Sequence, residues 1–255
     1  MRTSVIVVAN QKGGVGKTTT AINLSAALAQ RDYKTLLIDL DPQGNASLTF
    51  VDPRSQSHTV YELLVDREVK IQQAIQASES DKLDVISARI SLANADSKLI
   101  GEFDSYYRLK DKLEGLDGEY DFVVIDTPPT LGILTVNAMV AGTHLIVPVQ
   151  ASYFSLEGTA DLLDTYDRIR NRPNPNLKFL GVLITLHDKR TILAREVTQE
   201  IREKFRDRVF DTMISKSVRL EESPAHNQSI FTFAPRSSGA LEYYKLAQEV
   251  VDRVR

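Results

Sequence analysis

Apolar residues are grouped along the chain in short runs rich in Val, Ile and Leu, with longer stretches of mixed polarity between them. The runs VIVVA and FVVID are almost continuously hydrophobic, which is typical of strands buried on both faces of a parallel sheet. Six runs predict strands, and a seventh, placed last in this list, is a weaker candidate: Val5–Ala9, Thr35–Asp39, Leu83–Ile86, Phe122–Asp126, Leu145–Val149, Leu180–Thr185 and Ser229–Phe233.

The stretches between these runs carry the spacing of helices. In the last stretch, Tyr244, Ala247 and Val251 recur on one helical face, which indicates core packing. Because strands and helices alternate, we expect an α/β fold: a single domain over residues 1–255, in which helices cover both faces of a mostly parallel, twisted sheet. The expected helices are Lys17–Gln30, Val60–Gln76, Tyr106–Leu116, Ser155–Arg170, Ile192–Phe205 and Ala240–Val254.

A glycine-rich segment joins the first predicted strand to the first predicted helix. Its glycines allow left-handed backbone, so that successive amide N–H groups can face one anion. Lys17 and Thr18 follow at the helix start, where a lysine can hold the β- and γ-phosphates and a hydroxyl can ligate Mg²⁺. The pattern predicts a phosphate-binding loop for a nucleoside triphosphate. Its assigned residues are Lys12, Gly13, Gly14, Val15, Gly16, Lys17, Thr18 and Thr19.

Other polar residues near the loop are harder to assign. Gln11 stands where the ordinary pattern G-x-x-x-x-G-K-[ST] has its first glycine, and Lys12 follows it. Taken alone, Lys12 could be a solvated lysine. Asp41 and Asp126 lie at the ends of apolar runs, where open parallel sheets bind their ligands. Asp39 is either structural or an indirect partner of Mg²⁺, and the sequence favours neither.

The composition excludes several kinds of chemistry. The chain of 255 residues has no cysteine, which removes disulfides, thiolate catalysis, zinc–cysteine sites and iron–sulfur clusters. No run approaches the ~20 apolar residues of a membrane span, and the N-terminus does not read as a signal peptide, so we expect a cytoplasmic protein. The net charge is −3, but nine Lys/Arg and five Asp/Glu lie between Lys189 and Arg219, a local +4 that leaves −7 elsewhere. A basic face can therefore exist on an acidic chain.

The segment from Lys12 to Thr19, K-G-G-x-G-K-T-T, resembles the deviant Walker A loop of the ParA/Soj-type partition ATPases, within the group that also contains MinD. The resemblance runs nearly end to end. Asp126-Thr127-Pro128-Pro129-Thr130-Leu131-Gly132 resembles the switch II of this family, and the segment around Asp41 resembles its switch I. The run from Val218 to His226 is similar to V-R-L-S-E-A-P-S-H, although Ser215, Ser217 and Asn227 depart from the pattern around it.

The resemblance implies a Mg²⁺-dependent ATPase. In it, Lys17 binds the phosphates, and Lys12 reaches across an ATP-bound homodimer to the partner's nucleotide. Asp41 orients the attacking water, while Thr18 and Asp126 hold Mg²⁺. The catalytic set is therefore Lys12, Lys17 and Asp41, and we interpret His226 as structural.

The resemblance also implies partners. The dimer is expected to bind DNA without sequence preference through Arg190, Lys216 and Arg219, although a basic run by itself is more often a solvated face. A ParB-like centromere-binding protein, or a cargo adaptor, would stimulate slow hydrolysis and release the ATPase from the nucleoid. Because no segment for a helix-turn-helix precedes the first strand, we do not expect operator-specific repression.

Two alternatives share the loop. The first is a ParA-like ATPase that positions a protein cargo, such as a carboxysome or chemoreceptor cluster, instead of a plasmid or chromosome. The second is a MinD-like membrane switch, which would need a basic amphipathic C-terminal helix that the tail from Glu249 to Arg255 lacks. We expect no membrane partner. The absence of cysteine removes a reductase of the nitrogenase iron-protein type.

Overall fold

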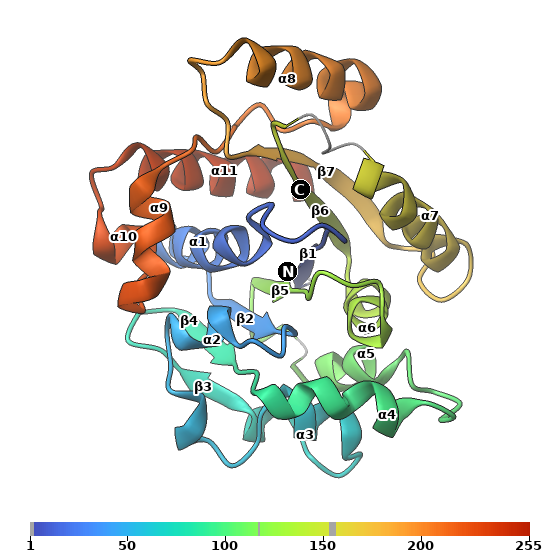
Figure 1. The fold of residues 1–255 in the computed structure, drawn as a ribbon. Helices are drawn as coiled ribbons and strands as arrows, with labels where there is room; N and C mark the ends of the chain where they lie inside the picture. Colours follow the sequence, from blue (N-terminus) through green and yellow to red (C-terminus); the bar gives the residue numbers. More distant parts are fainter. Residues whose placement is uncertain (1–2, 117, 153–156) are drawn as a thin grey trace.

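The computed structural model describes residues 3–116, 118–152 and 157–255. Its centre is a seven-stranded sheet in the order β3-β4-β2-β5-β1-β6-β7 (Figure 1). All neighbouring pairs are parallel except β3 and β4. The strands are β1 (Ser4–Val8), β2 (Thr35–Asp39), β3 (Ile75–Ala77), β4 (Leu83–Ile86), β5 (Phe122–Asp126), β6 (His144–Gln150) and β7 (Lys178–Thr185).

Helices cover both faces of this sheet, and each face has its own apolar core. Val5 and Val7 of β1 point into one core, while Ile6 and Val8 point into the other, as the two-residue period of a strand requires. The first core lies under α3 (Val60–Val65), α4 (Ala95–Leu99), α5 (Arg108–Leu113), α6 (Ile133–Ala141), α7 (Glu157–Asn171) and α8 (Ile192–Phe205). The second lies under α1 (Lys17–Gln30), α2 (Asn45–Leu48), α9 (Val218–Glu222), α10 (Ile230–Phe233) and α11 (Ser238–Val254).

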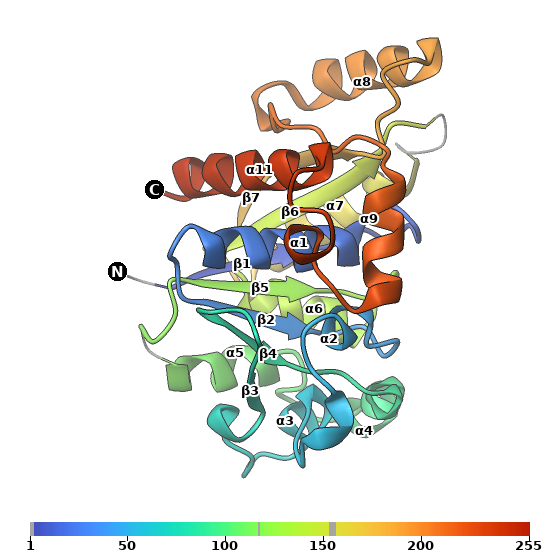
Figure 2. The same ribbon diagram turned by 90° about the vertical axis from the view of Figure 1, so that its left-hand side faces the viewer.

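The α/β class and the mostly parallel sheet are therefore confirmed. Short 3₁₀ turns link several of these elements, among them η2 (Ile71–Gln73), η4 (Glu114–Leu116), η5 (Arg206–Arg208) and η6 (Ser223–His226). Figure 2 shows the strand arrows pointing away from the side where the two chain termini lie. The carboxyl ends of β1, β2 and β5 consequently meet at one edge of the sheet.

Three predicted elements are wrong in kind or length. Ser229–Phe233 is not a strand, because its central residues form α10, whose Ile230 is buried against α1 while its amide donates to Asn23. The helix expected over Val60–Gln76 ends at Val65, and η2 and β3 follow. The helix expected over Tyr106–Leu116 is shortened to α5 and η4. The expected helix start at Ser155 lies outside the described residues.

Candidate nucleotide site

The glycine-rich segment forms an open loop between the carboxyl end of β1 and the first turn of α1. Gly14 and Gly16 have φ angles of 72° and 85°, a left-handed conformation that disfavours any residue with a side chain. A Cβ atom at Gly13 or Gly14 would meet nothing within 4 Å, so the loop faces open space on that side. Gly16 precedes the first residue of α1, which turns the positive end of that helix toward the same space.

Two contacts fix the loop to neighbouring strand ends. The Thr185 hydroxyl at the end of β7 donates to the Val15 carbonyl at 2.8 Å. The Asn10 amide donates to the Pro148 carbonyl in β6 at 2.7 Å, and its oxygen accepts from the Lys12 amide at 3.0 Å. All three partners are backbone groups of the loop or of β6, so these hydrogen bonds fix the backbone path of the loop.

Lys17 is buried beside this loop. Its ammonium group donates to the Lys12 carbonyl at 2.9 Å, and only 6% of the residue is exposed. Burial lowers the pKa of Lys17, while the nearby Asp126 and Asp41 carboxylates oppose that change. A buried ammonium with one carbonyl partner keeps two donors for an anion held by the loop.

Asp126 is a buried carboxylate whose surroundings disfavour its negative charge. It is fully buried at the end of β5, and neither carboxylate oxygen makes a hydrogen bond of good geometry within the described ranges. Burial raises the pKa of Asp126 well above its usual value, as does the adjacent Asp39, whereas the Thr18 hydroxyl and Lys17 oppose the rise. A buried carboxylate left without partners is the arrangement that a bound cation would stabilise. The pair Thr18 and Asp126 therefore fits a Mg²⁺ ion.

The two carboxylates that end β2 have different surroundings. Asp39 is buried and accepts hydrogen bonds from the Asp41 amide and from both the amide and hydroxyl of Ser47, at 2.7–3.0 Å. These contacts hold the following loop in place. Asp41 is half-exposed and accepts from the Gln43 amide at 3.0 Å. Of the two roles considered for Asp39, the contacts support the structural one.

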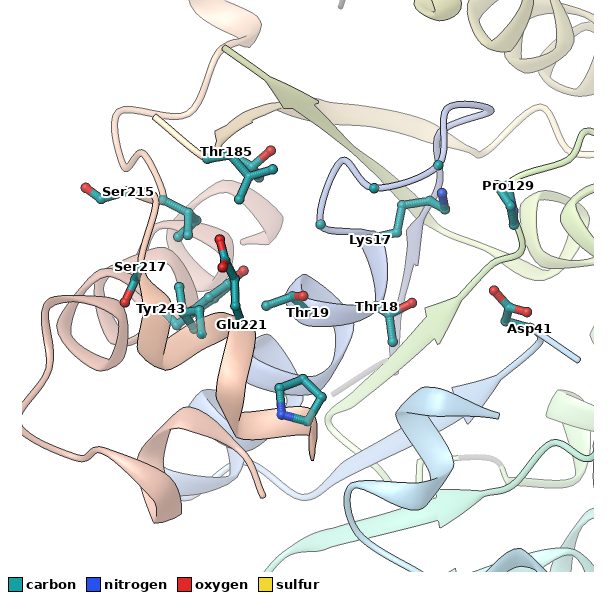
Figure 3. Close-up of a pocket in the computed structure, with 17 residues that line it drawn as sticks. Lys17, Thr18, Thr19, Asp41, Pro129, Thr185, Ser215, Ser217, Glu221 and Tyr243 are labelled. Atoms are coloured by element: carbon teal, nitrogen blue, oxygen red, sulfur yellow. The ribbon is translucent and has the colours of Figure 1, made fainter. Parts of the chain in front are cut away.

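The loop, Asp41 and the C-terminal part of the chain enclose one pocket of about 410 Å³ (Figure 3). Lys17, Thr18, Asp41 and Pro129 lie toward one end, and Ser217 and its neighbours lie toward the other. From this second end, the sequence singles out only the run from Val218 to His226 and the positions Ser215 and Ser217, and it assigns them no role in the pocket. Its described lining residues are Thr185, Leu186, Ile214, Ser215, Ser217, Leu220, Glu221, Pro224 and Tyr243.

Several of these residues carry no pattern that sequence analysis could use. Thr185 ends an apolar strand. Tyr243 is not on the helical face assigned to the core, and the placement of Tyr244 on that face is wrong, because the structure buries Tyr243 and leaves Tyr244 40% exposed. The Tyr243 hydroxyl lies 3.3 Å from that of Thr20 on α1. Among the residues assigned to the loop, Gly13, Gly14, Gly16, Lys17, Thr18 and Thr19 line the pocket, whereas the side chains of Lys12 and Val15 do not. Asp126 lies beneath the pocket rather than in its wall.

The three candidate DNA contacts lie in neighbouring segments. The His187 amide donates to the Ile214 carbonyl at 3.0 Å, and the Lys216 amide donates to the His187 carbonyl at 3.1 Å. This pairing brings the loop that carries Arg190 beside Lys216, and Arg219 follows in α9. All three residues are exposed. Arg190 pairs with Asp188, and Arg219 pairs with Glu222, at 2.9 and 3.1 Å.

The described residues limit other interpretations in two ways. They contain no group of three or more His, Asp or Glu side chains placed to hold a metal ion. A cation at Thr18 and Asp126 would therefore take its remaining ligand atoms from water or from a bound molecule. In the same part of the chain, no helix combines the length and the apolar character needed to cross a bilayer.

The fold and this site together define an α/β nucleotide-binding protein with a phosphate-binding loop. A family model described as "AAA domain" matches residues 3–179. The chain is 43% identical to the sporulation initiation inhibitor protein Soj of Bacillus subtilis, over 96% of this chain and 97% of Soj. It is 39% identical to the chromosome partitioning protein ParA of Myxococcus xanthus, over 98% of this chain and 88% of that protein. This chain belongs to the ParA/Soj family of partition ATPases, as its sequence motifs predict.

Solved structures agree with this assignment. Cobyrinic acid a,c-diamide synthase from Mycobacterium smegmatis, with bound ADP and magnesium, is 34% identical with a TM-score of 0.87, covering 99% of this chain and 95% of that one. The cell division ATPase MinD of Pyrococcus furiosus shares the fold, with 23% identity and a TM-score of 0.78 over 99% of both chains.

Proposed function

We propose that this protein is a Mg²⁺-dependent ATPase of a DNA-segregation system, which dimerises around ATP and is released from DNA when ATP is hydrolysed. The observation that carries this proposal is the buried, unpartnered Asp126 carboxylate next to Lys17 and Thr18 beneath an open glycine loop. The names of the relatives supply the cellular process, because those at 39–43% identity include a chromosome partitioning protein and Soj. We do not extend the diamide-synthase activity of the M. smegmatis protein to this chain, because its identity is lower at 34%.

The residues of the pocket have separate tasks in this proposal. The amides of Gly13, Gly14 and Gly16 and the Lys17 ammonium hold the β- and γ-phosphates. Thr18 and Asp126 hold Mg²⁺, which supplies charge neutralisation on the phosphates when bound. The half-exposed Asp41 carboxylate lines the same pocket and orients the attacking water. A carboxylate suits that task because phosphoryl transfer mainly needs a positioned nucleophile and stabilised phosphate charge.

Lys12 acts on the nucleotide of the second protomer. Its side chain does not line the pocket of its own chain, although its carbonyl accepts from Lys17. In a face-to-face dimer the two loops approach each other, and the ammonium of Lys12 enters the partner's phosphate site. Hydrolysis removes the γ-phosphate that both protomers share, so the dimer separates.

The dimer binds DNA without sequence preference through Arg190, Lys216 and Arg219, which are exposed in adjoining segments. Phosphate contacts by lysine and arginine position a protein on DNA without reading bases. A ParB-like protein bound to the cargo stimulates hydrolysis, and the ATPase is cytoplasmic and associated with the nucleoid. A protein-cargo adaptor in place of the ParB-like protein would use the same cycle.

A MinD-like membrane switch is a weaker candidate. Most apolar residues of α11, among them Leu246, Val250 and Val251, are buried in the core beside α1. Of the large hydrophobic residues of this helix, only Leu241 and Tyr244 are exposed. This helix therefore does not offer an apolar face to a bilayer.

The proposed cycle is tested with two lysine variants. Lys17→Ala should lose nucleotide binding, because it removes the buried charge beside the loop. Lys12→Ala should bind ATP but neither dimerise nor hydrolyse it, because the loop and Lys17 remain. Fluorescent-nucleotide titration and multi-angle light scattering with Mg²⁺–ATP and Mg²⁺–ADP would measure both steps. An ATP-dependent dimer of the Lys12→Ala protein would contradict the cross-dimer role.

A further inference from the structure

A second cavity, of about 610 Å³, lies at the amino ends of β1, β6 and β7. This is the opposite edge of the sheet from the nucleotide pocket, on the side where Figure 2 shows the chain termini. The two cavities share no lining residue. Its walls also include residues of α7, η5 and α11. Its volume is within the range of pockets that hold small molecules, roughly 300–1,000 Å³.

Positive charge dominates this second cavity. Arg170 of α7, Lys178 of β7 and Arg208 of η5 line it, and none of the described lining residues is Asp or Glu. Within the described ranges these three side chains form no salt bridge. A concave site lined by one sign of charge concentrates ions of the opposite sign.

A buried histidine completes the wall. His144 is only 6% exposed and lies beside Lys178, its register partner on the adjacent strand. Its Nδ1 atom lies 2.8 Å from the Thr143 hydroxyl, which already donates to the Val5 carbonyl at 3.0 Å. The same carbonyl also accepts from the Thr143 amide at 2.8 Å, and the hydroxyl accepts from the Val5 amide at 2.9 Å, so these contacts fit a proton on either ring nitrogen. Nε2 has no hydrogen-bond partner in the described part of the chain.

We propose that this cavity is a binding site for a small phosphorylated molecule, whose phosphate is held by Arg170, Lys178 and Arg208 next to the His144 ring. Three cations without carboxylate partners match a dianion, and charge-assisted hydrogen bonds to phosphate are among the stronger contacts a protein makes. The three cations are exposed to an incoming ligand, and the volume of the cavity favours a small molecule over duplex DNA. Nothing in the nucleotide pocket requires this second site.

The anion and a proton should bind together. Burial, together with Lys178, lowers the pKa of His144 to about 4, so the ring is neutral near pH 7. An anion held by the three cations beside the ring would stabilise the imidazolium form and raise that pKa. The charged groups facing His144 in the cavity are Arg170, Lys178 and Arg208. The adjoining hollow, which shares Arg208, is electrically mixed, with Lys204, Arg206, Asp167 and Asp207.

The chain has four histidines, so nuclear magnetic resonance of ¹³C-labelled histidine can follow His144 alone. The probe is sodium sulfate, a dianion that does not titrate near neutral pH, compared with sodium chloride at equal ionic strength. The protein is kept saturated with Mg²⁺–ADP so that the glycine loop is occupied. Sulfate should shift the His144 signal in a saturable manner and raise its pKa by about one unit or more.

Matched variants assign the contacts. Lys178→Gln and Arg208→Gln should each weaken sulfate binding about tenfold, because each removes one charge-assisted contact. Arg168→Gln removes the same charge from the same helix as Arg170 but does not line the cavity, so it should leave the binding unchanged. Inorganic phosphate and pyrophosphate, titrated in the same way, separate a free anion from a larger phosphorylated ligand.

Three results would overturn the proposal. The first is a His144 signal that responds to sulfate no more than to chloride. The second is an equal loss of binding in Arg168→Gln and Lys178→Gln, which would indicate general charge screening. The third is a His144 signal that responds to a 20-base-pair duplex but to none of the small anions, which would assign the cavity to DNA.

Discussion

At the scale of single residues, two aspartates two positions apart have opposite roles. The Asp39 carboxylate accepts hydrogen bonds from the Asp41 and Ser47 amides, whereas Asp41 lines the pocket. We expect Asp41→Ala to keep ATP-dependent dimerisation and to slow hydrolysis about 10²-fold or more, because only the positioning of water is lost. Single-turnover hydrolysis and light scattering would measure the two effects.

Asp39→Asn is the contrasting variant. An amide group cannot accept all three hydrogen bonds that the carboxylate accepts, so the loop from Asp41 to Ser47 should loosen and the melting temperature should fall. If Asp41→Ala failed to bind ATP and melted as early as Asp39→Asn, Asp41 would be a folding residue and its proposed role would be wrong.

His144 should make the free energy of unfolding depend on pH. Its pKa is about 4 in the folded chain and 6.5 when unperturbed, so between these values the unfolded state binds more protons. The free energy of unfolding should therefore fall by about 3 kcal/mol through this residue as the pH drops from 6.5 to 4, with no contribution above pH 6.5. His144→Asn should remove that loss. Urea unfolding of both proteins at pH 7, 5.5 and 4.5 tests this, and parallel pH profiles would contradict it.

At the scale of elements, Thr185 connects the end of β7 to the phosphate loop. Thr185→Val keeps the shape of the side chain but leaves the buried Val15 carbonyl without its donor. This should cost about 1–3 kcal/mol of stability and weaken nucleotide binding, because the loop loses an anchor. Thr165→Val is the control, since the Thr165 hydroxyl bonds the Asp161 carbonyl within α7, away from the loop. Equal effects of the two variants on nucleotide affinity would show that the anchor has no role.

The same scale shows how far the sequence predicts this fold. Strands β1, β2 and β5 lie in the middle of the sheet and are rich in Val, Leu and Ile, and β2 and β5 each end in an aspartate, so their pattern has one interpretation. α6 was not anticipated, because ILTVNAMVA is apolar on nearly every side and has no helical period. The helix from Val60 ends early because the Lys112 ammonium binds the carbonyls of Asp66, Arg67 and Val69, a contact between distant segments.

The candidate site likewise has one part that the sequence predicts and another part that it does not predict. Most of the phosphate half lies in one continuous segment, Gly13 to Thr19, whose residue types and spacing specify it, and Asp41 and Pro129 complete that end. The other half is assembled from the carboxyl end of β7 and from residues of α9 and α11, which are distant from the phosphate loop in the sequence. Thr185, Glu221 and Tyr243 meet only because the sheet places β7 beside β6 and the core packs α11 against α1.

At the scale of the whole molecule, the DNA-binding face should act only when ATP brings two copies together. Three contacts per protomer give six in the dimer, so log K should fall against log salt with a slope of about −0.9 × 6, roughly −5. The exposed Arg190 and Arg219 each already pair with a carboxylate, but such surface ion pairs are worth at most about 1 kcal/mol, so DNA phosphates can displace them.

Asp188, an acidic residue between two of these cations, allows a variant that should strengthen DNA binding instead of weakening it. Asp188 lies beside Arg190 and Lys216, which hold its pKa at about 2. Arg190→Ala, Lys216→Ala or Arg219→Ala should weaken binding to any duplex and make the slope shallower. Asp188→Asn should tighten binding, because it frees Arg190, and Arg172→Ala, an exposed arginine outside these segments, should change nothing. Each change is made in the Asp41→Ala background, so that hydrolysis does not dissolve the dimer, and binding is followed by fluorescence anisotropy across a salt series. If the alanine variants bind as tightly as their parent and with its slope, this face does not bind DNA.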